Sequence, residues 1–299
     1  MNFTRTPVKV ALGFVVGALV AGTVATAATS TNTGSVVVCA DNRTQALTLA
    51  KNNTCPVNKT AIEIGSNSIN AKSISALVTP SVVSISVKTT TGGGTGSGSI
   101  YKSSSSTSYI ITNNHVIAAS VTSGGDITVR LNDGSSYDAK VVGRDSSYDL
   151  AVLRIVGASL KALQFGDSDK VAVGDSVIAI GSPLGLTGTV TLGIISAKDR
   201  AVTAGESAEE NSFINALQTD AAINPGNSGG ALVDAQGRII GVNSAIATLS
   251  SGSTSGSIGL GFSIPINEAK RVIDEIIATG KSTRPVMGVV FDDVTADTQ

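Results

Sequence analysis

The sequence predicts an all-β protein, a sandwich or barrel, that ends in one helix. Short stretches of alternating apolar residues recur between Ile74 and Pro265, and glycine, asparagine and aspartate turns separate them. Glycine and β-branched residues abound while charged residues are only 14% of the chain, which suits a β-rich protein with many turns. Near the end, with Asn267 as the predicted cap and Gly280 after the last turn, apolar residues follow helical spacing: Ala269, Val272, Ile273, Ile276 and Ile277.

Residues 1–29 are predicted to be an export segment rather than part of the fold. Arg5 and Lys9 precede an uncharged, mostly apolar run from Val10 to Ala28. Small residues at the end of this run fit a secretory signal peptide cleaved after Ala27, and its length also fits an uncleaved transmembrane anchor. Either interpretation places the remaining chain outside the cytoplasm, so we expect an exported protein of the cell envelope or the medium.

Residues 30–71 are predicted to form a small β module followed by a linker. The only two cysteines, Cys39 and Cys55, lie in this segment, and an even pair in an oxidising compartment predicts a disulfide. Two free thiols are the alternative. The segment resembles small two-cysteine β modules at the surface of some bacterial proteins. About 30 residues bury little core, so we expect the disulfide to supply much of the stability.

Composition and motifs exclude several classes of function. The 21 basic and 22 acidic residues nearly balance, and no basic tract stands out, so neither nucleic acid nor anionic lipid is the expected partner. No sequence cluster of histidine, cysteine and carboxylate indicates a metal site, and we expect no cofactor. The glycine-rich segment 92–98 lacks the dinucleotide-binding spacing, and the segment that ends at Lys281 and Ser282 lacks the first glycine of a phosphate-binding loop.

Three distant residues have the types and the chain order of a serine protease triad. His115 is the only histidine, Asp149 follows it, and a glycine-flanked Ser228 lies far downstream. In this hypothesis His115 is the base that activates the Ser228 hydroxyl, while Asp149 orients the imidazole. The backbone N–H groups of Gly226 and Ser228 are expected to form an oxyanion hole. Each residue alone has an ordinary structural explanation, but their joint order predicts catalysis.

The strings around these residues resemble the protease domain of the HtrA/Deg family of serine endopeptidases. The resemblance extends from about Ile74 to Ile277, and five strings carry it: residues 110–116, 148–155, 179–185, 218–230 and 259–265. It implies that the domain at 72–283 consists of two six-stranded antiparallel β-barrels of the chymotrypsin/trypsin type. His115 and Asp149 would come from the first barrel and Ser228 from the second.

The resemblance also bears on activation. Asn227 precedes the serine where zymogens carry an acid that pairs with a new N-terminus, so no processing of a pro-segment is expected. Activity should instead depend on the ordering of two polar loops, Lys198–Leu217 and Ala245–Ile258. Residues 284–299 resemble the start of a PDZ domain and are too few to complete one. Relatives assemble as trimers, which makes a homotrimer an expectation here.

The predicted function is an ATP-independent serine endopeptidase that cleaves unfolded or damaged proteins through an acyl-enzyme. Ala222 lies six positions before Ser228, where trypsin-type pockets carry an acid, which by resemblance predicts a small aliphatic residue at P1. We expect Ala222 and Asn224 to contact the substrate. Two alternatives belong to other classes: a chaperone or binding protein that captures proteins more than it cleaves them, and a surface protein whose two-cysteine module binds envelope material.

Overall fold

The computed structural model describes residues 35–44, 46–52, 54–65, 70–90, 92–182, 188–204, 212–244 and 257–283. The chain divides into two compact units, Met1–Asn67 and Ser68–Gln299. The predicted export segment and the predicted start of a PDZ domain lie outside the described residues. Among the helices in those ranges, none is both long and apolar enough to cross a membrane.

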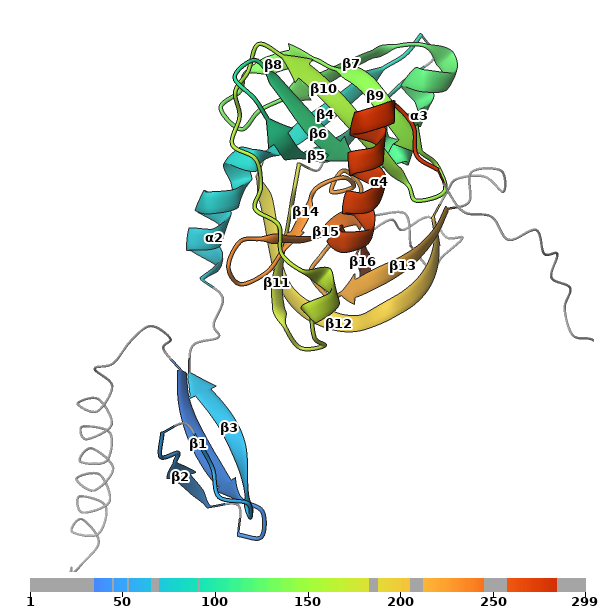
Figure 1. The fold of residues 1–299 in the computed structure, drawn as a ribbon. Coiled ribbons are helices and arrows are strands. Elements are labelled where there is room, and N and C mark those ends of the chain that lie inside the picture. Colours follow the sequence, from blue (N-terminus) through green and yellow to red (C-terminus); the bar gives the residue numbers. More distant parts are fainter. Residues whose placement is uncertain are drawn as a thin grey trace, which may run out of the picture. The chain divides into compact units, whose positions relative to one another are not determined.

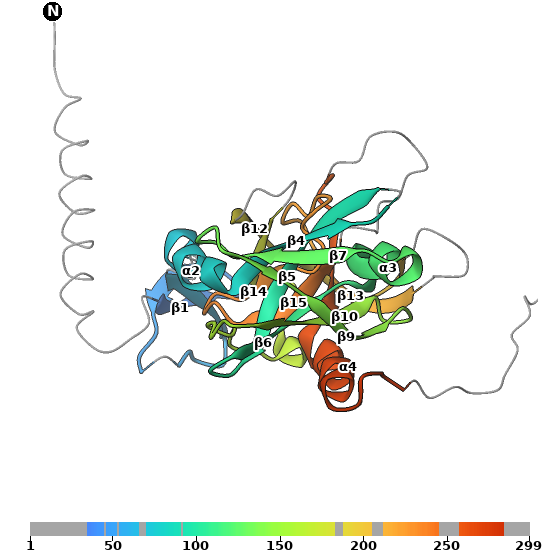
Figure 2. The same ribbon diagram turned by 90° about the horizontal axis from the view of Figure 1, so that it is seen from above.

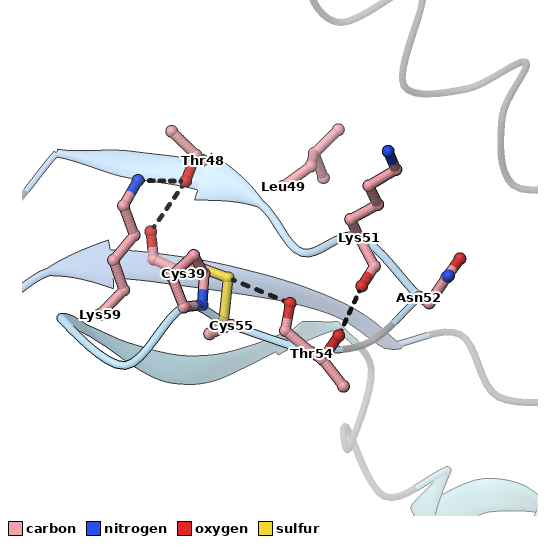
Figure 3. Close-up of a pocket in the computed structure, with 9 residues that line it drawn as sticks. Cys39, Thr48, Leu49, Lys51, Asn52, Thr54, Cys55 and Lys59 are labelled. Carbon is pink, nitrogen blue, oxygen red and sulfur yellow. Dashed lines mark hydrogen bonds between the residues drawn. A yellow bond between two sulfur atoms is a disulfide. The ribbon is translucent and has the colours of Figure 1, made fainter.

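The first unit is a three-stranded antiparallel sheet that is cross-linked by a disulfide (Figure 3). The central strand β1 (Ser35–Asp41) pairs with β2 (Leu47–Leu49) on one side and with β3 (Lys59–Gly65) on the other. Cys39 of β1 is bonded to Cys55, which precedes β3, so the predicted disulfide is present. The Lys59 ammonium donates to Thr48 Oγ1 at 3.0 Å, and the Thr48 hydroxyl donates to the Cys39 carbonyl at 3.3 Å. Side chains of β2 and β3 are therefore linked to each other and to the β1 backbone at Cys39.

The second unit begins with helix α2 (Ala71–Val78) and a 3-10 turn, η1 (Thr79–Ser81). Its first lobe is a seven-stranded antiparallel sheet in the order β8-β7-β4-β5-β6-β10-β9 (Figure 1). The strands are β4 (Val82–Lys88), β5 (Gly93–Ser103), β6 (Thr107–Thr112), β7 (Asp126–Arg130), β8 (Ser136–Asp138), β9 (Lys140–Asp145) and β10 (Leu150–Val156). Helix α3 (Asn114–Ser123) follows β6 directly and packs against β4, β5, β7 and β10 (Figure 2).

The second lobe is a closed six-stranded barrel in the order β11-β12-β13-β16-β15-β14. Its strands are β11 (Ser176–Gly181), β12 (Thr189–Ala204), β13 (Ser212–Thr219), β14 (Ala231–Val233), β15 (Ile239–Ser244) and β16 (Gly261–Pro265). The short turn η2 (Ser168–Lys170) lies on the connection between the lobes, and helix α4 (Ile266–Thr279) follows β16.

Both faces of β10 are apolar because successive side chains of this strand point into two different cores. Ala151, Leu153 and Ile155 face the core of the first lobe, while Leu150 and Val152 face a second core shared with the barrel and with α4. Helix α4 packs against β9 and β10 of the first lobe and against β15 and β16 of the barrel (Figure 1). The shared core fixes the two lobes relative to each other, and this arrangement positions the site at their boundary.

The predicted trypsin-type all-β fold with its C-terminal helix is confirmed, with three differences in detail. The first lobe is a seven-stranded sheet with β8 and β9 at its ends rather than a six-stranded ring, and the turn at Asn132–Gly134 adds the short strand β8. Two helices, α2 and α3, accompany the one predicted helix. The predicted helix start is wrong by two residues, because Pro265 is the cap and the Asn267 amide donates instead to Asp167 at 2.8 Å. Gly280 ends α4 in the left-handed conformation as expected.

Candidate active site

His115 occupies the first turn of α3, immediately after the β6 strand. Its imidazole Nδ1 lies 3.0 and 2.9 Å from the two carboxylate oxygens of Asp149, and its backbone N–H donates to Asp149 Oδ1 at 3.0 Å. An ionised carboxylate can only accept hydrogen bonds, so Nδ1 carries the proton in this arrangement. The neutral imidazole therefore keeps the lone pair of Nε2, which is the atom a general base needs.

Asp149 is 3% exposed and has a positive φ of 51°. A non-glycine residue in this region costs on the order of 1–3 kcal/mol and persists only where neighbours enforce it. The Asn113 amide enforces it here by donating to the Asp149 carbonyl at 2.9 Å, and the Asp149 N–H donates to the Ser146 carbonyl at 3.3 Å. The strained turn directs the carboxylate toward α3.

A third donor completes the surroundings of the buried carboxylate. The Ser244 hydroxyl, at the end of β15 in the barrel, donates to Asp149 Oδ2 at 3.3 Å. His115 supplies the other two donors, from its backbone and its ring. A buried charge needs such partners, and these three come from both lobes.

Ser228 lies in a buried turn between β13 and β14 and is 4% exposed. Gly226 and Gly229 have φ values of 95° and 84°, which permit the sharp backbone course around the serine. The turn is closed by two hydrogen bonds, from Asn227 N–H to the Asn224 carbonyl at 2.9 Å and from Gly230 N–H to the Asn227 carbonyl at 3.0 Å.

Two hydrogen-bonded paths connect the serine turn to the His115–Asp149 pair. On the first-lobe side, Ser97 N–H of β5 donates to the Ser228 carbonyl at 2.8 Å, and the Thr112 hydroxyl, at the end of β6, donates to the Ser97 carbonyl at 2.7 Å. On the barrel side, Gly229 N–H donates to the Asn243 carbonyl at 2.9 Å. Asn243 is followed by Ser244, the partner of Asp149. The structure thus links the segments that carry the three predicted triad residues, at the boundary between the lobes.

The predicted substrate-contacting residues precede the serine in the same turn. The Ala222 carbonyl accepts from the Thr191 hydroxyl of β12 at 2.9 Å, and the Asn224 amide oxygen accepts from Ser257 N–H at 2.7 Å. Most of the loop predicted at Ala245–Ile258 lies outside the described residues, and so does part of the other predicted loop, Lys198–Leu217. Within the described ranges, no three metal-ligating side chains gather at one place.

Comparisons with known proteins place this geometry in a family. Residues 96–242 match the family model described as a trypsin-like peptidase domain. The chain is 46% identical over 230 residues to the serine protease PepD of Mycobacterium tuberculosis, which covers 74% of this chain and 49% of PepD. It is 48% identical over 189 residues to a probable periplasmic serine endoprotease, DegP-like, of Chlamydia trachomatis, over 63% of this chain and 35% of that protein.

A solved structure of the HtrA-type protease AlgW with a decapeptide superposes with a TM-score of 0.62 at 36% identity, over 77% of this chain and 74% of AlgW. The chain belongs to the HtrA family of serine proteases. It spans about half or less of the length of the two curated relatives described above.

Sequence reasoning missed the side chains that hold this HtrA site in place. Ser97, Asn113 and Ser244 are all buried and each bonds a residue of the triad segments. Asn113 had a signal, because it lies two residues before His115 within a string that carried the family resemblance. Ser97 and Ser244 are separated from their partners by 129 and 95 residues, and no local pattern marks them.

Proposed function

We propose that this HtrA family member is an endopeptidase that cleaves flexible or unfolded protein chains through an acyl-enzyme formed on Ser228. The observation that carries the proposal is the contact of His115 Nδ1 with both carboxylate oxygens of Asp149, beside the buried Ser228 turn. This contact fixes the tautomer in which Nε2 can accept the proton of the nucleophile.

The proposed chemistry follows from these roles. Ser228 Oγ attacks the substrate carbonyl carbon, and its proton passes to His115 Nε2. The negative charge that develops on the carbonyl oxygen is stabilised by the backbone N–H groups of Gly226 and Ser228. Collapse of this intermediate expels the amine, which takes the proton from His115, and water then hydrolyses the acyl-enzyme by the same steps. Asp149 stabilises the imidazolium in both halves of the reaction.

Substrate preference is proposed from Ala222 and the backbone around it. The pocket position occupied by Ala222 carries no charge, so it offers a basic P1 side chain no partner. A small aliphatic P1 residue such as valine or alanine is the expected fit. Asn224, whose side chain accepts from Ser257 N–H at 2.7 Å, ties the turn to the end of the predicted loop Ala245–Ile258.

Export is part of the proposal and has two supports. The Cys39–Cys55 disulfide is typical of a protein in an oxidising compartment, and the chlamydial relative is described as probably periplasmic. Whether the N-terminal segment is a cleaved signal or an anchor stays a prediction, and the same holds for a homotrimer.

Cleavage of β-casein by the full chain, with product ends mapped by mass spectrometry, tests the proposal. We expect aliphatic residues at P1 and a loss of turnover of about 10⁶ in Ser228→Ala, as for removal of a triad nucleophile. A folded wild type that binds casein without cleaving it would favour the alternative of a chaperone or binding protein.

A further inference from the structure

Ser97 is a wholly buried serine on β5 of the first lobe, and its side chain contacts the nucleophile turn of the other lobe. We propose that Ser97 is a positioning residue whose hydroxyl fixes the peptide between Gly226 and Asn227 and thereby preforms the oxyanion hole. The inference rests on the proposed function, in which the N–H groups of Gly226 and Ser228 bind the oxyanion.

The hydrogen bonds of the Ser97 hydroxyl have only one consistent direction. Ser182 N–H, just beyond β11, donates to Ser97 Oγ at 2.7 Å, and Ser97 Oγ lies 2.6 Å from the Gly226 carbonyl oxygen. A backbone N–H can only donate and a carbonyl can only accept, so the single hydroxyl proton must be directed to Gly226. The result is a directed relay from Ser182 through Ser97 to Gly226, in which each bond polarises the next.

This relay fixes one peptide plane from both of its sides. The Gly226 carbonyl is held toward β5 by the Ser97 hydroxyl, and the N–H of the same peptide, which belongs to Asn227, donates to the Asn224 carbonyl at 2.9 Å. The backbone N–H of Ser97 holds the Ser228 carbonyl at 2.8 Å. One residue of the first lobe therefore anchors the turn both before the nucleophile and at it.

A glycine at position 226 makes such an anchor necessary. Gly226 has a φ of 95°, and a glycine can rotate its flanking peptides with little steric cost. The Gly226 N–H belongs to the preceding peptide, so rotation about the backbone bonds of Gly226 would change its direction relative to the held peptide and to the Ser228 N–H. A donor lost from an oxyanion hole costs about 10²–10³ in turnover. Without the Ser97 hydroxyl, the Gly226 carbonyl also loses its hydrogen-bond partner in a partly buried site.

The test compares Ser97→Ala with a matched buried serine, Ser108→Ala. The Ser108 hydroxyl is equally buried in the same lobe and donates to the Ala158 carbonyl at 3.0 Å, remote from the triad segments. Both variants lose one hydroxyl bonded to a backbone carbonyl, so both report the general cost of that loss. The readouts are kcat and KM for a peptide with valine at P1, and Ki for the corresponding peptide aldehyde. The aldehyde adds to Ser228 Oγ and directs its oxyanion into the hole, while the serine proton passes to His115.

For Ser97→Ala we expect kcat to fall by about 10–10³-fold, KM to stay within about threefold, and Ki of the aldehyde to rise by a similar factor to the kcat loss. Ser108→Ala should keep kcat and Ki within about twofold. If Ser97→Ala does not fold, Ser97→Cys serves in its place. The thiol is nearly isosteric with the hydroxyl but is a weak donor, so the same pattern is expected at smaller amplitude.

Several outcomes would overturn the inference while leaving the proposed function intact. One is a folded Ser97→Ala or Ser97→Cys enzyme with wild-type kcat. Another is a change in KM alone, and a third is a fall in kcat with unchanged affinity for the aldehyde. In contrast, a folded wild type that neither cleaves the peptide nor binds the aldehyde would contradict the proposed function itself, and with it the premise of the role of Ser97.

Discussion

The carboxylate of Asp149 accepts two hydrogen bonds from His115, one from the backbone N–H at 3.0 Å and one from the ring Nδ1 at 2.9 Å. The first bond ties the aspartate to the start of α3, and the second sets the tautomer of the imidazole. A single residue pair thus determines both where the base lies and which of its nitrogens carries the proton.

The substitution Asp149→Asn separates these two effects. The amide oxygen of the introduced side chain can still accept from the backbone N–H of His115, but its NH₂ group favours the tautomer with an unprotonated Nδ1. We expect kcat for peptide cleavage to fall by about 10⁴ with little loss of stability. Steady-state kinetics and a thermal melt check this, and a kcat within about tenfold of the wild type would refute the orienting role of Asp149.

Ser244→Ala removes the third donor to the carboxylate and leaves the His115 pair intact. The 3.3 Å bond is long, and the two shorter bonds from His115 remain, so we expect kcat to fall by about tenfold. The ordering of effects is the test: the loss in Ser244→Ala must be smaller than in Asp149→Asn. A larger loss would mean that Ser244, rather than His115, mainly holds the aspartate.

Gly229→Ala is expected to destabilise the protein strongly, because two independent costs coincide there. A Cβ at Gly229 would lie 2.1 Å from the Ser97 carbonyl oxygen, and the residue has a φ of 84°. We expect the free energy of unfolding to fall by about 2–4 kcal/mol.

Gly134→Ala is the matched control for Gly229→Ala. Gly134 has a φ of 91°, but its added Cβ would meet nothing within 4 Å. Only the conformational cost of about 1–2 kcal/mol is expected there. Urea unfolding of both variants measures the difference, and equal losses would show that the contact with Ser97 contributes nothing.

The sequence was sufficient to predict the parts of the fold and site that local patterns specify. Alternating apolar residues gave the β class, and the spacing from Ala269 to Ile277 gave the helix α4. Its start was misjudged, because Asn267 is a good cap by type, whereas its amide is engaged by Asp167 and Pro265 already ends the strand. The pairing of two cysteines within one short segment likewise needed no tertiary information.

What could not be predicted depends on contacts between distant segments. Helix α3, which carries His115, buries the polar residues Asn114 and Ser120 together with Val116 and Ile117, so its sequence shows no clear apolar stripe. The strained φ of Asp149 follows from neighbours such as Asn113 rather than from its own type. Such residues are fixed by contacts between segments of the first lobe that lie far apart in the sequence.

Loss of the disulfide should act on the first unit alone. Cys39 and Cys55 are 16 positions apart, and the chain-entropy model gives about 3 kcal/mol for closing a loop of this length. In the Cys39→Ser, Cys55→Ser double variant we expect amide hydrogens of β1 and β3 to exchange much faster, with cleavage of casein unchanged. Hydrogen exchange followed by mass spectrometry measures this. Retained protection in β1 and β3 would mean that the three-stranded sheet is stable without its covalent link.

Tyr101 connects the first lobe to α4, and its ionisation gives a pH-dependent test of that connection. Its hydroxyl donates to Asp274 Oδ1 at 2.7 Å, and burial, followed by this bond to a carboxylate, raises the pKa of Tyr101 well above its ordinary value of 10.0. Because the folded-state pKa is the higher one, this contribution to stability is complete below about pH 10 and is lost as the pH rises further.

In an alkaline titration followed by phenolate absorbance, one of the four tyrosines should ionise only on unfolding. Tyr101→Phe should abolish that late step and lower the free energy of unfolding near neutral pH by about 1 kcal/mol. A late step that persists in Tyr101→Phe would assign it to another tyrosine and contradict the role given to this hydrogen bond.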